Sequence, residues 1–143
     1  MSVKTDKGGF MQRSFFEIYI HLIWATKNRE PMLTPDIEET IINIMHVKAK
    51  KHKANILAIG GTENHVHVLI SMHPDTVLSE IIKEMKASSS YFVNHNMGKN
   101  LYWQDGYGAL SVSKKGIEKL KEYINHQKEH HANVNTVELY EKY

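Results

Sequence analysis

The chain contains no cysteine among its 143 residues. Disulfide bonds and thiolate metal sites are therefore excluded, and the composition is compatible with a reducing cytoplasm. The chain also lacks any apolar run close to the roughly 20 residues that span a bilayer. Residues 1–14 lack the apolar segment of a signal peptide. These absences predict a cytoplasmic protein with no membrane partner.

An excess of charge of one sign is missing as well. Lys and Arg number 18 and Asp and Glu number 16, so the formal net charge is only +2. Any basic surface for nucleic acid must therefore come from local clustering of cations. Histidine, by contrast, is abundant, with ten residues that are candidate metal ligands. The length and the 41% hydrophobic content suit one domain with its own core.

Hydrophobic periodicity predicts the order strand, helix, strand, strand, helix, strand, helix. Strands are expected at residues 15–26, 55–59, 65–72 and 109–112, and helices at 35–53, from 74–76 to a polar loop at 94–100, and at 113–131. Residues 60–64 are predicted to form a turn, residues 1–14 a flexible arm, and residues 132–143 a polar tail beyond a domain at 15–131.

Two helices on one face of an antiparallel sheet predict a ferredoxin-like α+β fold. The first strand has one wholly apolar face and one mixed face, which is typical of a sheet covered on one side only. The second helix has a predicted buried stripe that includes Ser89 and Phe92. The last helix is surplus to the two-helix unit, so it must pack on the open sheet face or on a second subunit.

His65 and His67 lie two residues apart in a predicted strand, so both rings point to the same face. Two imidazoles from one strand can hold a divalent metal if a third ligand comes from elsewhere. Histidines at alternate positions of a strand can also simply face solvent, and spacing alone favours that alternative. His21 lies on the mixed face of its own strand, where it could be a further ligand or a hydrogen-bonded partner.

The last predicted helix carries Tyr123 and Gln127 four residues apart, on one face. His126 and His130 extend this polar stripe, which runs beside an apolar one. A tyrosine oxygen and an amide oxygen could thus approach one site together. The alternative is a solvated helix face with a tyrosine packed at its border, and spacing alone favours that alternative.

These residues resemble a known family. His65-Val66-His67 fits the His-hydrophobic-His motif of HUH single-strand nucleases, and residues 123–127 resemble the helix of the single-tyrosine HUH transposases, the insertion-sequence-200-like family. Residues 21–27, 86–90 and 103–108 match further blocks in the same order. The resemblance covers residues 15–131, and the blocks together are specific where His-x-His alone is weak.

The resemblance implies a ferredoxin-like homodimer in a bacterial or archaeal cytoplasm. It makes His65, His67 and Gln127 the ligands of Mg²⁺ or Mn²⁺, although this donor set would also suit zinc. It makes Tyr123 the nucleophile, on a helix that can serve the partner's metal site. Glycines before and at the start of that helix would permit the swing; they are Gly106, Gly108 and Gly116. Asn64 departs from the Asp found there in many relatives.

The implied reaction is cleavage and rejoining of single-stranded DNA that carries hairpin ends. A tyrosine has an ordinary pKa of about 10, so it needs help to attack at neutral pH. Attack on a phosphodiester would give a 5′-phosphotyrosine and a free 3′-OH, and another 3′-OH would then rejoin the strand. The bound metal would polarise the scissile phosphate and stabilise the leaving oxygen.

Candidate DNA contacts follow from residue type. Cations could meet phosphates and aromatic rings could stack on unpaired bases; the candidates are Lys27, Arg29, Lys83, Lys86, Trp103 and Tyr107. The alternatives are solvated lysines and aromatic side chains packed in the core.

Three other functions are consistent with the sequence. They are a domesticated nuclease acting on chromosomal repeat hairpins, a non-catalytic ferredoxin-like nucleic-acid-binding module, and a zinc hydrolase that would use Glu63 as its base. A Tyr123 that is buried, or that lies far from the two histidines both in its own chain and in any partner, would overturn the strand-transfer interpretation.

Overall fold

The computed structural model describes residues 14–127. The elements are β1 (Ile18–Ala25), α1 (Pro35–Lys51), β2 (Ala54–Gly61), β3 (His65–Met72), α2 (Leu78–Asn96), β4 (Gly108–Ser111) and α3 (Ile117–Asn125), with 3₁₀ turns η1 (Lys27–Arg29) and η2 (Lys114–Gly116). The predicted order of strands and helices is confirmed. The predicted tail, the predicted helix beyond residue 127, and all of the predicted arm except Ser14 lie outside the described residues.

The four strands form one antiparallel sheet in the order β2-β3-β1-β4. This topology confirms the predicted ferredoxin-like α+β fold. Strand β3 lies in the middle, where Ala25 of β1 is the partner of His65 and Gly60 of β2 is the partner of His67. The histidine pair therefore lies between two neighbouring strands rather than at the sheet edge.

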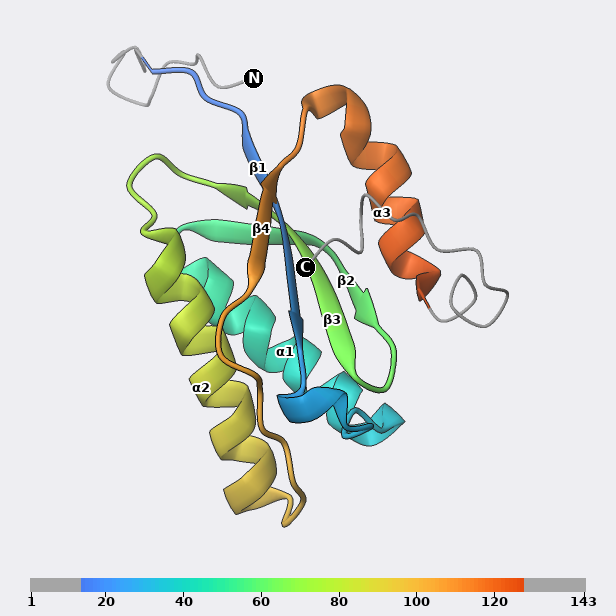
Figure 1. The fold of residues 1–143 in the computed structure, drawn as a ribbon. Helices are drawn as coiled ribbons and strands as arrows, with labels where there is room; N and C mark the ends of the chain where they lie inside the picture. Colours follow the sequence, from blue (N-terminus) through green and yellow to red (C-terminus); the bar gives the residue numbers. More distant parts are fainter. Residues whose placement is uncertain (1–13, 128–143) are drawn as a thin grey trace.

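The sheet is covered on both faces (Figure 1). Alternate residues of β1 and β3, such as Leu22 and Val68, pack with α1 and α2 in the larger core. Leu69, which points the other way, packs with Leu120, Ile124 and other residues of α3 in a smaller core. The expectation of a sheet covered on one side only is therefore wrong. Of the two predicted places for the last helix, it occupies the open sheet face of its own chain.

The boundaries differ from the prediction where long-range contacts override local signals. Gly60 and Gly61 end β2 instead of opening the turn, because they pair with β3. Helix α2 begins at Leu78, later than expected, and continues to Asn96 through part of the predicted loop. Phe92 is 38% exposed and Val93 is buried in its place, because Val93 continues the four-residue spacing from Ser89.

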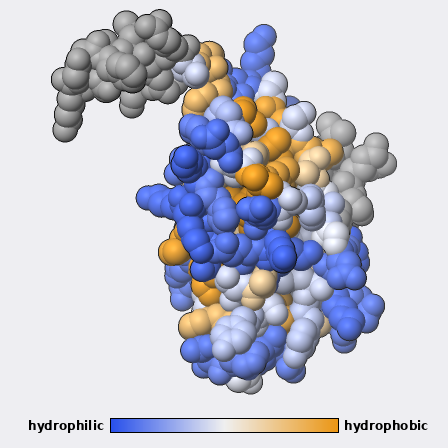
Figure 2. Space-filling view, turned by 90° about the vertical axis from the view of Figure 1, so that its left-hand side faces the viewer, coloured by the Kyte–Doolittle hydropathy of each residue, from blue (hydrophilic) through white to orange (hydrophobic). Residues whose placement is uncertain are grey.

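The surface is mainly hydrophilic on the face shown in Figure 2, and hydrophobic residues reach it in patches. Among the large hydrophobic side chains that are exposed, Tyr102 and Tyr107 lie on the segment that leads into β4. No helix within residues 14–127 is both long enough and apolar enough to cross a membrane.

Candidate functional site

His67 lies at the centre of a buried cluster of rings. The ring of His21 stacks on it with centroids 5.1 Å apart, and the rings of His65 and Tyr123 meet it edge-on at 5.1 and 6.0 Å. His21 is 1% exposed and His67 is fully buried. The alternative in which the alternate histidines simply face solvent is wrong, because α3 covers this face of the sheet. Nε2 of His21 lies 2.8 Å from Nδ1 of His67. Of the two roles that the sequence left open for His21, this contact supports that of a hydrogen-bonded partner.

His65 is held by the turn that precedes it. Its Nδ1 lies 2.9 Å from Oγ1 of Thr62 and 2.9 Å from Oδ1 of Asn64. The Thr62 amide also donates to the carbonyl of His65, which closes the turn. Asn64 thus contacts the Nδ1 side of the ring. Each histidine of the pair has a fixed partner at Nδ1.

Helix α3 brings Tyr123 to the histidines of its own chain. Its apolar residues Ile117, Leu120 and Ile124 are buried against the sheet, and Tyr123 is buried with them at 4% exposure. Tyr123 is therefore close to the histidine pair, as strand transfer requires, but it is also buried, which is contrary to the expected accessible phenol and overturns strand transfer unless α3 moves away from the sheet. His126 is exposed, whereas Tyr123 and Gln127 are buried, so the predicted polar stripe is divided; His130 lies outside the described residues.

A glycine allows the close approach of α3 to the sheet. A Cβ atom at Gly60 would lie 2.5 Å from the carbonyl oxygen of Ile124, so any side chain there would displace the helix or the strand. The same two residues line a small cavity of about 280 Å³ together with Gly61 and Gln127. Because Gly60 is the β2 partner of His67, this contact brings the end of α3 toward the histidine pair.

The donor groups suit a divalent cation. Two imidazoles and one amide are buried on the same side of the sheet, with His65 at 4%, His67 at 0% and Gln127 at 1% exposure. Within residues 14–127, no group of three His, Cys, Asp or Glu side chains is placed to hold a metal ion. Gln127, whose neutral amide is outside these residue types, is the third donor that the family resemblance implies. Glu63, the base required by a zinc hydrolase, is exposed in the turn.

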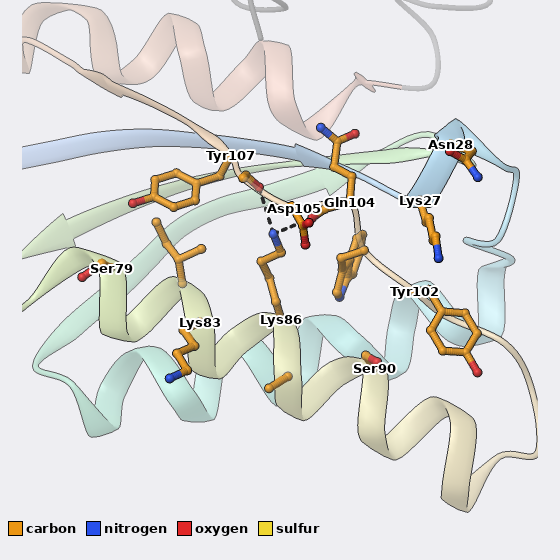
Figure 3. Close-up of a pocket in the computed structure, with 14 residues that line it drawn as sticks. Lys27, Asn28, Ser79, Lys83, Lys86, Ser90, Tyr102, Gln104, Asp105 and Tyr107 are labelled. Atoms are coloured by element: carbon orange, nitrogen blue, oxygen red, sulfur yellow. Dashed lines mark hydrogen bonds between the residues drawn. The ribbon is translucent and has the colours of Figure 1, made fainter.

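A second feature is a groove of about 720 Å³ between α2 and the segment 102–107 (Figure 3). The Asn94 side chain bonds both backbone groups of Leu101, at 2.8 and 2.9 Å. The Lys27 amide donates to the carbonyl of Tyr102, and the Gln104 amide to that of Ala25. The segment is thus attached to α2 at its start and to the end of β1.

Five of the six predicted DNA contacts line this groove, namely Lys27, Lys83, Lys86, Trp103 and Tyr107; Arg29 does not. Lys86 donates from Nζ to the carbonyls of Gln104 and Gly106, both at 2.8 Å, and so holds the segment to α2. Burial lowers the pKa of Lys86, and the nearby Asp105 opposes that shift. Gly106, with φ of 84°, is the one of the three predicted hinge glycines whose backbone favours glycine.

The aromatic residues of the groove divide into packed and exposed ones. Trp103 is half-buried, donates from Nε1 to Oγ of Ser89 at 3.0 Å and meets Trp24 edge-on, so it forms part of the core. Tyr107 is 39% exposed and Tyr102, which the sequence did not single out, is 49% exposed. In Figure 3, these two tyrosines lie toward opposite ends of the groove with Lys86 between them.

The groove and the histidine site meet at one end of the sheet. Lys27 lines the groove, and the residue before it, Thr26, donates both its amide and its hydroxyl to the carbonyl of Asn64. Asn64 in turn contacts His65. A chain of direct contacts therefore connects the groove beside α2 with the histidines that face α3.

Comparison with known proteins places these features in a family context. A family model described as Transposase IS200 like matches residues 14–127. The ISDra2 transposase TnpA of Deinococcus radiodurans is 26% identical over 120 residues, which cover 78% of this chain and 85% of that protein.

Two solved structures share the fold with a TM-score of 0.64 each. A candidate transposase from Deinococcus radiodurans R1 is 24% identical and is matched over 81% of this chain and 95% of its own. A REP-associated tyrosine transposase bound to a REP hairpin is 18% identical and is matched over 84% of this chain and 72% of its own.

Proposed function

Because the chain belongs to the IS200-like transposase family, we propose that it cleaves and rejoins single-stranded DNA with Tyr123 as the nucleophile. The observation that carries this proposal is the edge-on contact of Tyr123 with His67, at 6.0 Å between ring centroids, within one chain. Seven tyrosines occur in the sequence, and Tyr123 lies beside the His-Val-His strand. The relative bound to a REP hairpin supports hairpin-ended DNA as the substrate.

The proposed reaction exchanges one phosphodiester for another. The Tyr123 oxygen forms a bond to the scissile phosphorus, the bond to the 3′ oxygen breaks, and the hydroxyl proton of tyrosine is lost while the 3′ oxygen gains one. The products are a 5′-phosphotyrosine and a free 3′-OH, and attack by another 3′-OH reverses the exchange on a new strand. No nucleotide cofactor is required, because the ester energies are similar.

The proposed cofactor is Mg²⁺ or Mn²⁺, held by His65, His67 and Gln127. A divalent ion there supplies Lewis-acid polarisation of a phosphate oxygen. The burial of all three side chains and the fixed Nδ1 partners of both histidines support this assignment, because such partners orient ligand rings. The chain itself contributes the orientation of the rings and the exclusion of water.

Reaction also requires an opening movement. Tyr123 is 4% exposed, so a phosphate can reach its hydroxyl only when α3 moves away from the sheet. Loops and helices that cover active sites commonly move in this way. We propose a homodimer as the working state, in which α3 of each subunit opens over the histidine pair of its own chain.

The nucleophile is tested with labelled single strands taken from the DNA that flanks the coding sequence, incubated with Mg²⁺. Wild type is expected to form a covalent protein–DNA adduct on a denaturing gel, and Tyr123→Phe to form none while still binding the strand. Tyr91→Phe is the matched control, because Tyr91 is 62% exposed on α2. An adduct that persists in Tyr123→Phe would remove Tyr123 from the role.

We propose that the groove beside α2 binds the unpaired part of the DNA. Its lining contains three lysines and the acidic Asp105, and two of its tyrosines expose their rings. A stacked base is worth about 1–3 kcal/mol when the aromatic ring is removed. Tyr102→Ala and Tyr107→Ala are therefore each expected to weaken binding of a fluorescent single strand by roughly 5- to 150-fold.

The control for the groove is Tyr91→Ala. Tyr91 is an exposed tyrosine on α2, the helix that borders the groove, but it does not line the groove. Anisotropy titrations of the three variants at one salt concentration make the comparison. Equal affinity of all three variants and wild type would contradict binding of bases in the groove.

A further inference from the structure

A hydrogen bond between two imidazoles connects β1 with the histidine pair of β3. Nε2 of His21 lies 2.8 Å from Nδ1 of His67, and the ring planes are inclined by 23°. The register makes Ile23 the direct partner of His67 and Leu69 that of His21, so the two histidines are diagonal neighbours on one face. Diagonal pairs of this kind are within reach of ring side chains.

The bond requires one nitrogen to donate and the other to accept, and this couples the tautomers of the two rings. If Nε2 of His21 donates, Nδ1 of His67 accepts and the proton of the neutral His67 ring lies on its Nε2. If Nδ1 of His67 donates, its Nε2 carries a lone pair instead. Only the second arrangement allows His67 to bind a cation through Nε2.

We propose that His21 is a positioning residue that accepts this hydrogen bond and thereby holds His67 in the Nδ1–H tautomer. The inference rests on the proposed function, in which His67 is a metal ligand. Metal-binding histidines commonly donate their other ring N–H to a carboxylate, a carbonyl or a water. Here the acceptor is a second imidazole, fixed by burial at 1% exposure and by stacking on the ring that it orients.

The two histidines of the pair are oriented from different parts of the chain. His65 has its Nδ1 partners within three residues, in Thr62 and Asn64. His67 depends on a residue 46 positions away. Orientation of His67 thus requires that β1 and β3 be correctly paired, whereas orientation of His65 requires only the turn.

The test compares two variants of His21 in the full-length protein without DNA. His21→Phe keeps a stacked ring but removes the acceptor, and His21→Gln places an amide oxygen near the position of Nε2. Titration with Mn²⁺, followed by the electron paramagnetic resonance signal of the free ion, is expected to show a loss of about 10- to 100-fold in affinity for His21→Phe. His21→Gln is expected to recover most of that loss.

Equal Mn²⁺ affinity of His21→Phe and wild type would overturn the positioning role and leave the metal site intact. Failure of wild type to bind Mn²⁺ would instead refute the proposed metal site, and the positioning role of His21 would fall with it. If His21→Phe does not fold, long-range ¹H–¹⁵N NMR spectra of the wild-type protein without metal decide the matter. The expected signals place the proton of His67 on Nδ1, and a proton on Nε2 would overturn the inference.

Discussion

At the scale of single residues, two long-range contacts determine how the side chains of the candidate site are placed. Nδ1 of His67 has a partner 2.8 Å away in Nε2 of His21. Gly60 is useful because it lacks a Cβ, which leaves room for the carbonyl of Ile124. Tyr123 and Gln127 reach the sheet from α3 as a consequence of that close approach.

Gly60→Ala tests this contact. The added methyl group would lie 2.5 Å from the Ile124 oxygen, so the end of α3 must shift. Overpacking of this kind costs roughly 1–3 kcal/mol, and the shift moves Tyr123 relative to His67. We expect adduct formation to fall strongly, while circular dichroism shows that the rest of the fold is retained.

Gly116→Ala is the matched control at the other end of α3. A Cβ atom there would have its nearest contacts at 3.6 and 3.7 Å, and the backbone has φ of −89°, which alanine adopts readily. The backbone at Gly116 does not need the freedom of glycine, unlike that at Gly106, so adduct formation by Gly116→Ala should equal that of wild type. If Gly60→Ala were as active as Gly116→Ala, the close approach would not matter for the site.

The residue types of the site could be predicted from the sequence, but their partners could not. The two-residue spacing of His65 and His67 and the four-residue spacing of Tyr123 and Gln127 are local patterns, and the structure places both pairs on the side of the sheet covered by α3. His21 and Gly60 act through residues 46 and 64 positions away, respectively. Local periodicity carries no information about such contacts.

At the scale of elements, α1 and α2 are joined at the end of α1 by ion pairs to a single carboxylate. Glu84 of α2 lies 2.7 Å from His52, 2.9 Å from Lys51 and 3.5 Å from Lys48. Hydrogen bonds from His52 and Lys51 lower the pKa of Glu84 from 4.5 to about 2. Because α2 forms one wall of the groove, this contact also fixes the groove relative to the sheet.

A lowered carboxyl pKa has a defined effect on stability. The folded chain favours the charged form of Glu84. The contribution of Glu84 to the free energy of unfolding is therefore present above pH 4.5 and is lost as the pH falls toward about 2. We expect the free energy of unfolding, measured with urea, to fall more steeply across this pH window for wild type than for Glu84→Gln. Glu80→Gln, an exposed change on the same helix, should follow wild type; identical slopes for all three would contradict the effect.

The elements themselves were largely predictable, and their ends were not. The strand alternation of β1 and the helical spacing of α2 are repeated over many residues, so their existence and order are confirmed. The ends depend on tertiary contacts. Gly60 and Gly61 remain in β2 because they pair with β3, and α2 continues to Asn96 where the Asn94 side chain binds Leu101.

At the scale of the whole molecule, the sheet separates two features that the proposed reaction needs. Helix α2, which borders the groove, covers one face of the sheet, and α3, which carries Tyr123, covers the other (Figure 1). In the part of the chain that the structure describes, the contact of Thr26 with Asn64 connects these two features at one end of the sheet. A single strand bound in the groove would therefore pass this end to reach the histidines.

The central claim is that one chain carries a complete site, with Tyr123 beside its own His67. Co-expression of wild type with an excess of the double variant His67→Ala, Tyr123→Phe tests it most directly. Separate tags allow the wild-type chains to be quantified in the mixed preparation. The DNA adduct formed per wild-type chain is the quantity to measure.

If each chain uses its own tyrosine, the adduct per wild-type chain is unchanged by the excess of double variant. If the tyrosine of one chain serves the histidines of its partner, every mixed dimer is inactive and the yield falls as the double variant increases. We predict a constant yield, and a falling yield would contradict the arrangement of the site within one chain.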